Sequence, residues 1–309
     1  MLSLEYLNKL YATYQDVATI QVEEFSIRNR AFLFNTQPAI MGVVNFSSES
    51  WYRESVCLSL GMATQRSHIL AAQGADIIDV GTESTLGYTE KIGEEHQINQ
   101  LLPLLGALKQ TDIITSIETY YTGVAYESLK AGADIINYTG RSDSTIMYEI
   151  VADFDAAIIL CYLQGQHVRD VQDLIFENDP ISTMYNYFSK ALEAATKAGV
   201  KKIFIDPGLG FYYKNLKDSA SRINFQMQIF LNSFRLRKLG FPICNALPHA
   251  FECFGEEVRT AEGFFAVLAA LGKTNLFRTH EVSRVKAILD TMALFTLDST
   301  VASSQRIDS

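Results

Sequence analysis

The 309-residue chain lacks the features that assign a protein to several common classes. Its four cysteines show no Cys-x-x-Cys spacing and stand in apolar surroundings, so we expect reduced, buried thiols and no metal site built on them. These residues are Cys57, Cys161, Cys244 and Cys253. No apolar run is long enough to span a bilayer, and Glu5 and Lys9 interrupt the N-terminal apolar residues, which argues against a signal peptide. We therefore expect a cytoplasmic protein without a membrane partner.

The chain also lacks an excess of positive charge. Its 26 Lys and Arg residues stand against 35 Asp and Glu residues, for a formal net charge of -9. This balance argues against nucleic acid or an anionic membrane surface as the main partner. A phosphorylated small molecule stays compatible with it, because a local cluster of cations is enough to bind one.

From residue 39 onward, short apolar segments alternate with segments of helical periodicity. Eight apolar strands, each followed by a helix, are typical of a (β/α)8 TIM barrel, because alternating units demand crossovers onto a parallel sheet. The expected strands are 39–44, 76–80, 113–117, 134–136, 157–160, 203–205, 242–244 and 275–277. The clearest helical segments are 58–73, 95–108, 181–198, 215–239 and 261–271. The phrase Gly-Ala-Asp-Ile-Ile occurs at 74–78 and at 132–136, where glycine is expected to end a helix and the acid to begin a strand.

The hydrophobic fraction of 48% is sufficient for a large core. We assign residues 39–297 to the barrel and residues 298–309 to a polar tail. Residues 1–38 form an N-terminal extension with a helix in 2–14 and a hairpin strand in 24–34. We interpret this extension as a lid or plug at one end of the barrel.

Several of the expected strands end on a polar residue, and in an α/β barrel these positions face one common mouth. The strand 203–205 stops on Asp206, and Pro207 and Gly208 then force a tight loop in which backbone can approach a ligand closely. The other polar residues at or just after strand ends are Asn45, Glu83, Ser84, Thr85, Glu118, Asn137, Arg278 and His280.

Two subsets of these residues make chemical sense. The first offers carboxylates and an amide, which suit a heterocycle with a row of N–H donors, because one carboxylate can accept two parallel hydrogen bonds. Its members are Glu118, Asn137 and Asp206. The second offers hydrogen-bond donors and a cation, which suit a phosphate or pyrophosphate. Its members are Asn45, Thr85, Arg278 and His280.

Structural roles compete with these interpretations. Glu118 would serve equally well as a salt-bridged barrel carboxylate, and Arg278 with His280 as a surface pair at the start of a helix. The two asparagines would serve as loop caps, although their places at strand ends favour ligand contact. The remaining histidines outside the loop after residue 246, His68, His96 and His167, are expected to be solvated.

Taken together, the motifs resemble the dihydropteroate synthase family, a (β/α)8 enzyme family of folate synthesis, over nearly all of residues 39–290. The similarity rests on six motifs that occur in the family's order. They are Ile40-Met41-Gly42-Val43-Val44-Asn45, Gly74 to Gly81 with Glu83-Ser84-Thr85, Ser116-Ile117-Glu118-Thr119, Gly132 to Asn137, Asp206-Pro207-Gly208-Leu209-Gly210-Phe211, and Arg278-Thr279-His280-Glu281-Val282.

The resemblance implies a site for a pterin that carries a hydroxymethyl pyrophosphate. By that interpretation Asp206 and Asn137 hold the pyrimidine edge of the pterin, and Glu118 contacts another part of the ring. The resemblance also implies that Asn45 with Mg²⁺, and Thr85, Arg278 and His280, hold the pyrophosphate, with Asn45 as the metal ligand. These residues are implied to support displacement of pyrophosphate by the amine of p-aminobenzoate, with no covalent nucleophile. A homodimer formed through late helices, such as 261–271, is a further expectation.

The chain departs from the family pattern at positions that matter for the acceptor. Where the family has Gly-x-Ser-Arg-Lys, this sequence has Ala246-Leu247-Pro248-His249-Ala250, so the lysine and the Ser-Arg pair are absent. The second loop has Leu86-Gly87 in place of Arg-Pro, and the fifth strand ends in Cys161-Tyr162-Leu163-Gln164-Gly165 in place of Met-His-Met-Arg-Gly.

These departures leave three functions open. The first is a synthase-like transferase with reduced or altered activity, and the second is a non-catalytic protein that binds a pterin or pterin phosphate. The third is a methyl-transfer pterin domain that serves corrinoid proteins. Arg278-x-His280 argues against the third, because a methylated folate carries no pyrophosphate at that position.

Overall fold

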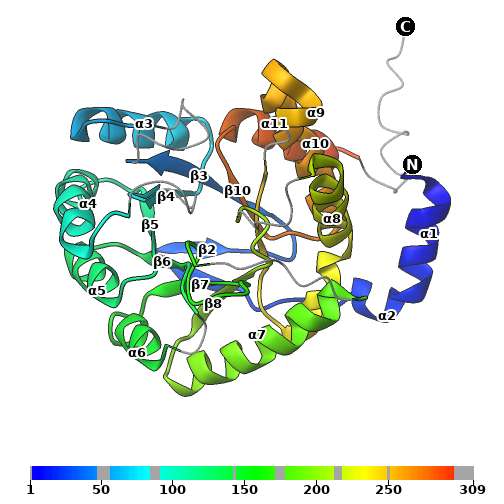
Figure 1. Cartoon of the computed structure of the whole chain (residues 1–309), viewed down its shortest axis with the longest axis horizontal. Helices are drawn as coiled ribbons and strands as arrows, with labels where there is room; N and C mark the ends of the chain where they lie inside the picture. Colours follow the sequence, from blue (N-terminus) through cyan, green and yellow to red (C-terminus); the bar gives the residue numbers. More distant parts are fainter. Residues whose placement is uncertain are drawn as a thin grey trace, which may run out of the picture.

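The computed structural model describes residues 2–46, 56–83, 91–141, 144–170, 178–211, 218–248 and 251–295. Within these residues, a sheet of eight parallel strands has the order β8-β7-β6-β5-β4-β3-β10-β9 (Figure 1). A parallel bridge between Ile205 and Ile243 joins the two ends of this order, so the sheet closes into a barrel. The strands are β3 (Ala39–Asn45), β4 (Ile77–Gly81), β5 (Ile114–Thr119), β6 (Ile135–Tyr138), β7 (Ala157–Cys161), β8 (Lys202–Asp206), β9 (Cys244–Ala246) and β10 (Leu276–Thr279). The predicted (β/α)8 fold is confirmed.

Helices surround the barrel (Figure 1). They are α3 (Leu60–Ala72), α4 (Glu94–Leu108), α5 (Thr122–Ala131), α6 (Thr145–Asp153), α7 (Pro180–Lys197), α8 (Ser219–Asn232), α9 (Phe251–Phe254), α10 (Val258–Leu271) and α11 (Val282–Ala293), with 3-10 segments η2 (Ser233–Leu239) and η3 (Gly255–Glu257). The helix expected over 215–239 changes to a 3-10 helix at Ser233, whose hydroxyl donates to the carbonyls of Phe230 and Gly272. Such a side-chain bond to the backbone competes with continued α-helical pairing.

The repeated Gly-Ala-Asp phrase marks helix ends, as the sequence indicates. Gly74 and Gly132 follow α3 and α5 with φ of +103° and +110°, a left-handed conformation that glycine adopts without a steric penalty. The acid two residues later then joins neighbouring strands: Asp76 accepts a hydrogen bond from the Ile40 N–H at 2.7 Å, and Asp134 accepts one from the Thr115 N–H at 2.8 Å.

The N-terminal hairpin of β1 (Phe25–Ile27) and β2 (Arg30–Phe32) packs against the interior residues of the barrel. Phe25 of the hairpin and Phe34, which follows β2, contact Phe204 of β8, with ring centroids 5.1 and 5.3 Å from that of Phe204. The hairpin is also tied to the repeated acids, because Arg28 Nε donates to Asp134 at 2.6 Å and Arg30 forms an ion pair with Asp76. These acids stand where the strands begin. The hairpin therefore closes the amino-terminal end of the barrel, opposite the carboxyl ends of the strands.

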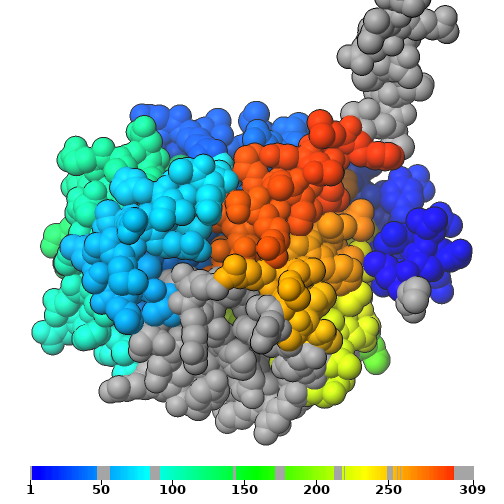
Figure 2. Space-filling view, turned by 90° about the horizontal axis from the view of Figure 1, so that it is seen from above, coloured from blue at the N-terminus to red at the C-terminus, as the bar shows by residue number. Residues whose placement is uncertain are grey.

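The first helices, α1 (Leu4–Thr13) and α2 (Gln15–Ala18), lie at the edge of the molecule in both views (Figures 1 and 2). Buried Val17 of α2 packs with Phe234 of η2, so this segment attaches to the outside of the barrel. The proposed boundaries of the extension, barrel and tail stay predictions, and residues 298–309 lie outside the described residues. In the described part of the chain, no helix combines the length and apolar character needed to cross a membrane.

Candidate functional site

The carboxyl ends of the strands hold a buried polar network centred on Asp79 of β4. Asp79 is fully buried and accepts hydrogen bonds from Ser116 Oγ at 2.6 Å and from Asn137 Nδ2 at 3.1 Å. Arg278 of β10 donates from Nε to Asp79 at 2.7 Å and from Nη2 to Glu118 of β5. The network therefore brings together three of the predicted site residues, Asn137, Glu118 and Arg278, through a carboxylate that the prediction did not include.

Arg278 is committed to two ion pairs inside the barrel. Its side chain is 17% exposed, so the alternative of a surface pair is wrong for this residue. Burial alone would lower the pKa of the guanidinium, but the carboxylates of Glu118 and Asp79 outweigh burial and raise it. The ion-paired interpretation of Glu118 is correct, and burial raises the pKa of Glu118 to about 7 against the opposing charge of Arg278.

Asp206 ends β8 and is 4% exposed. Its Oδ1 accepts a hydrogen bond from the Gly208 N–H at 2.7 Å. Gly208 has φ of +75°, and a Cβ there would lie 2.2 Å from the Tyr162 carbonyl oxygen, so only glycine allows this turn. Burial raises the pKa of Asp206 to about 6. The carboxylate therefore sits where a ligand with N–H donors would offset its lost hydration.

Two buried thiols complete this side of the mouth. Cys161 donates from Sγ to Asn137 Oδ1 at 3.6 Å, and Cys244 hydrogen-bonds to Asp206. Burial raises the pKa of both thiols, which keeps them protonated as weak donors. The prediction of buried thiols holds for these residues and Cys57, whereas Cys253 is exposed because its helix α9 presents it to solvent.

Asn45 and His280 stand at the ends of the adjacent strands β3 and β10. A Cβ at Gly81 would lie 3.4 Å from Asn45 Oδ1 and 3.6 Å from Glu118 Oε2, which are ordinary contact distances. The side-chain oxygens of Asn45 and Glu118 therefore flank Gly81 at the ends of neighbouring strands. The remaining predicted anion ligand, Thr85, lies outside the described residues.

Glu262 of α10 accepts hydrogen bonds from the turn that carries His280. Glu262 is fully buried, and it accepts hydrogen bonds from the Thr279 hydroxyl and from the Glu281 N–H at 3.3 Å. Burial raises the pKa of Glu262 to about 7. These bonds fix the backbone on both sides of His280, so Glu262 positions the histidine without sharing its strand.

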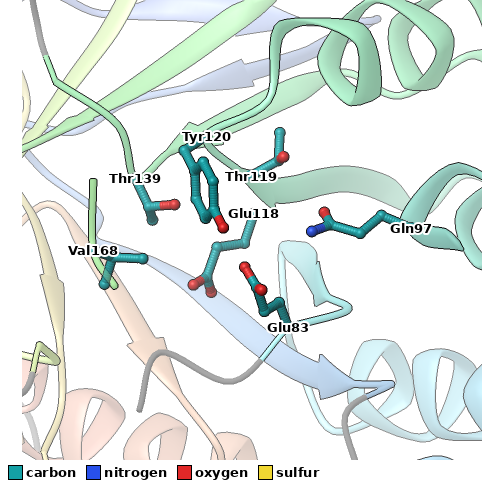
Figure 3. Close-up of a pocket in the computed structure, with 7 residues that line it drawn as sticks. All are labelled: Glu83, Gln97, Glu118, Thr119, Tyr120, Thr139 and Val168. Atoms are coloured by element: carbon teal, nitrogen blue, oxygen red, sulfur yellow. The ribbon is translucent and has the colours of Figure 1, made fainter. Parts of the chain in front are cut away.

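A small pocket opens beside Glu118, between the ends of β4, β5 and β6 (Figure 3). It is lined by Glu83, Gln97, Glu118, Thr119, Tyr120, Thr139 and Val168. The Tyr120 hydroxyl hydrogen-bonds to Glu83, which also forms a buried ion pair with Arg169 at 2.9 Å. Glu83 is therefore paired with Tyr120 and Arg169. Glu118 both lines the pocket and, through Arg278, belongs to the network around Asp79.

The ring of His167 stacks on Tyr120, with centroids 4.3 Å apart and planes at 8°. The prediction that His167 is solvated is therefore wrong, whereas His68 and His96 are exposed as expected. The sequence pattern contained no signal for this contact, because His167 follows β7 and Tyr120 follows β5, and only the fold brings the two loops together.

Asp79 and Glu262 are two buried polar residues of the mouth that sequence reasoning missed. Asp79 lies within a strand rather than at its end, so a rule based on strand ends passes over it. A carboxylate in the middle of an otherwise apolar strand, as in Ile77-Ile78-Asp79-Val80, is itself a usable signal, since an isolated buried charge requires a partner.

Within the described residues, no group of three or more His, Cys, Asp or Glu side chains is arranged to hold a metal ion. Asn45 nevertheless fits a magnesium ion, because Mg²⁺ prefers oxygen ligands and takes few of them from the protein when phosphates and waters supply the rest. The side-chain oxygen of Asn45 lies beside Gly81 at the carboxyl end of β3.

Comparisons with known proteins identify relatives of this chain. The family described as pterin binding enzyme matches residues 41–243. Dihydropteroate synthase from Streptococcus pyogenes serotype M6 is 30% identical over 264 residues, which cover 81% of this chain and 93% of that protein.

Solved structures give the same result for the fold. A dihydropteroate synthase from Clostridium difficile, in the presence of pteroic acid, is 26% identical with a TM-score of 0.70, covering 84% of this chain and 97% of that one. The dihydropteroate synthase of Thermus thermophilus in complex with 4-aminobenzoate has a TM-score of 0.73 at 22% identity, covering 88% and 100%. These structures share the fold of this chain.

Proposed function

The chain belongs to the pterin-binding enzyme family, and from this premise we propose that it is a dihydropteroate synthase-like transferase. Its substrates would be 6-hydroxymethyl-7,8-dihydropterin pyrophosphate and p-aminobenzoate, joined in folate biosynthesis. The observation that carries the proposal is the buried carboxylate of Asp206, whose pKa of about 6 reflects lost hydration. A pterin offers the row of N–H donors that would offset this loss.

In this proposal the protein acts by holding the pterin and by accommodating charge on the leaving group. Asp206 and Asn137 bind the pyrimidine edge, and Glu118 contacts another part of the ring. A bond forms between the acceptor nitrogen and the pterin methylene carbon, the bond from that carbon to the pyrophosphate oxygen breaks, and the amine loses a proton. Positioning and electrostatic stabilisation suffice for such a displacement, so no side-chain nucleophile is required.

The pyrophosphate would lie against Asn45, Thr85, Arg278 and His280, with Asn45 as the protein ligand of Mg²⁺. When bound, Mg²⁺ would neutralise charge that builds on the departing pyrophosphate. The amide oxygen of Asn45, at the carboxyl end of β3, supports this assignment.

A second candidate function is a non-catalytic protein that binds a pterin or a pterin phosphate. It is favoured by the end of β9 and the loop after it, where Ala246, Leu247 and Pro248 stand in place of the family's Gly-x-Ser. A Cβ at Gly210 would lie 3.2 Å from Cβ of Ala246, so this side of the Asp206 loop meets an alanine. His249 and Ala250, where Arg and Lys would stand, lie outside the described residues. A buried charged hydrogen bond contributes about 1.5–3 kcal/mol, so loss of the lysine alone could slow turnover at least about tenfold.

The test is pyrophosphate release by the purified protein, supplied with the dihydropterin pyrophosphate and Mg²⁺, in the presence and absence of p-aminobenzoate. We expect release that depends on p-aminobenzoate and that the Asp206→Asn variant does not show. Binding of the pterin pyrophosphate by calorimetry without any release would instead establish the non-catalytic function. Absence of both release and binding would contradict both candidates.

A further inference from the structure

We propose that Arg66 of α3 is an additional anion-binding residue of this site and receives the pyrophosphate of the pterin substrate. The inference rests on the function proposed above and adds to it a residue that neither the motifs nor the strand-end pattern includes. Three observations carry it: the charge state of Arg278, the position of Arg66, and the absence of a counter-charge for Arg66 among the described residues.

Arg278 does not supply a net positive charge to the mouth. Its single charge faces two carboxyl groups, Asp79 through Nε and Glu118 through Nη2. Asp206 and Glu83 lie close enough to raise the pKa of Glu118 further. A pyrophosphate placed at this end of the barrel therefore meets a surplus of carboxyl groups, and like charges in a buried site repel strongly. A further cation of the protein, in addition to Mg²⁺, would therefore strengthen the attraction for the anion.

Arg66 lies at the ends of the two strands that carry Asn45 and His280. Its Nη2 donates to the His280 carbonyl oxygen at 3.2 Å. Its charge also interacts with the thiol of Cys57, whose N–H donates to the Asn45 carbonyl oxygen at 2.7 Å. The guanidinium therefore lies beside the turn that carries His280 and close enough to interact with Cys57, which pairs with Asn45 at the end of β3.

The surrounding helices agree with this placement. A Cβ on Gly42 of β3 would meet Leu70 of α3 and Val282 of α11, so both helices pack on the same strand. Figure 2 shows α3 (light blue) beside α11 (orange-red) on one face of the molecule. Arg66 of α3 therefore reaches the turn before α11 without crossing the barrel.

Arg66 carries a charge without a protein counter-charge in the part of the chain that the structure describes. It forms no ion pair there, and its buried Nε has no hydrogen-bond partner. Burial lowers the pKa of the guanidinium, which means that desolvation of its charge is not offset. An unpaired donor on a half-buried cation is costly, and a phosphate oxygen would satisfy it. The planar guanidinium can also bind two phosphate oxygens at once.

The experiment compares three ligands by calorimetry at fixed Mg²⁺: the dihydropterin alcohol, its pyrophosphate, and inorganic pyrophosphate. Arg66→Gln should weaken binding of the pterin pyrophosphate and of inorganic pyrophosphate by about tenfold or more, as expected for a lost charged hydrogen bond. Its affinity for the alcohol should equal that of the wild type. Arg66→Lys should show an intermediate loss, because the charge remains and the two-point geometry does not.

Arg30→Gln is the matched control, since Arg30 is a cation of the hairpin at the opposite end of the barrel. It should leave all three affinities unchanged. Wild-type affinity of Arg66→Gln for the pterin pyrophosphate, or equal losses for the alcohol and the pyrophosphate, would overturn the inference. If Arg66→Gln does not fold, Arg66→Lys replaces it in the test, and wild-type affinity of that variant for the pterin pyrophosphate overturns the inference.

Binding of inorganic pyrophosphate tests the anion site independently of the proposed pterin function. A wild-type protein that binds neither pterin but binds pyrophosphate through Arg66 would refute the pterin function and support the anion site. A wild-type protein that binds no pyrophosphate in any form would overturn the anion site itself.

Discussion

At the scale of single residues, the mouth of the barrel holds carboxyl groups that titrate near neutral pH. Asp206 and Glu118 have pKa values of about 6 and about 7, in both cases chiefly because burial disfavours the charged form. Asp206 accepts hydrogen bonds from the Gly208 N–H and the Cys244 thiol, and Glu118 accepts one from Arg278. A ligand that donates further hydrogen bonds would stabilise the charged forms and would itself bind more tightly to them.

The first prediction at this scale concerns pH. Because the ionised Asp206 carboxylate accepts the pterin's N–H donors, affinity for the free dihydropterin alcohol should fall by about tenfold for each pH unit below about 6. Asp206→Asn should abolish this binding at every pH and leave the fold intact. Calorimetric titrations between pH 5 and pH 8 test both statements, with exposed Asp155→Asn as the control. An affinity that is independent of pH, or an Asp206→Asn variant that binds normally, would contradict the role of this carboxylate.

At the scale of elements, the turn between β10 and α11 depends on a side chain of a third element. Glu262 of α10 accepts hydrogen bonds from the Thr279 hydroxyl and the Glu281 N–H, on either side of His280. In the unfolded chain a glutamate loses its proton near 4.5, whereas burial moves the pKa of Glu262 to about 7. Between these two values the folded state binds more protons than the unfolded state, so the free energy of unfolding decreases as the pH rises.

The second prediction follows from this difference. Ionisation of Glu262 should lower the stability of the wild type by up to about 3 kcal/mol between pH 4.5 and pH 8, and Glu262→Gln should remove that part of the pH dependence. Thermal unfolding of both proteins at pH 5 and pH 8 measures it, because the contributions of Asp206 and Glu118 are common to both. Identical pH dependence in the two proteins would show that Glu262 does not titrate in this range.

At the scale of the whole molecule, α10 presents an apolar stripe to solvent. Phe264, Val267 and Leu271 are 41%, 36% and 47% exposed, whereas Phe265 and Leu268 on the other side of the helix are buried in the core. The spacing places the exposed residues on one helical face. Leu294 and Phe295, which follow the neighbouring α11, are also exposed. Such a surface is suited to burial against a second copy of the chain.

We therefore expect a homodimer at micromolar concentration that the double change Phe264→Glu and Val267→Glu converts to a monomer. The control is Ile146→Glu on α6, an exposed apolar residue on a helix across the barrel from α10 (Figure 1). Light scattering coupled to size-exclusion chromatography distinguishes the species. A monomeric wild type, or a dimer that survives the double change, would rule out this face.

The sequence by itself determined the barrel, because alternating apolar strands and amphipathic helices are local patterns that each segment carries. It also pointed to Asp206, Asn137 and Glu118, since residues that follow parallel strands must share one mouth. Only the tertiary structure decided which of these groups meet. Arg278 is 199 positions from Asp79 and 160 from Glu118, so its neutralisation depends on closure of the whole sheet.

Contacts between residues far apart in the sequence also explain why the sequence did not indicate the roles of Arg66, Glu262 and His167. Arg66 is 214 positions from the carbonyl of His280 that it contacts, and Glu262 holds that same turn from another helix. The stacking of His167 on Tyr120 likewise requires two loops to meet. Local periodicity sets secondary structure, whereas partners, burial and pKa values arise from distant segments that the closed barrel brings together, and these decide where the mouth can bind charge.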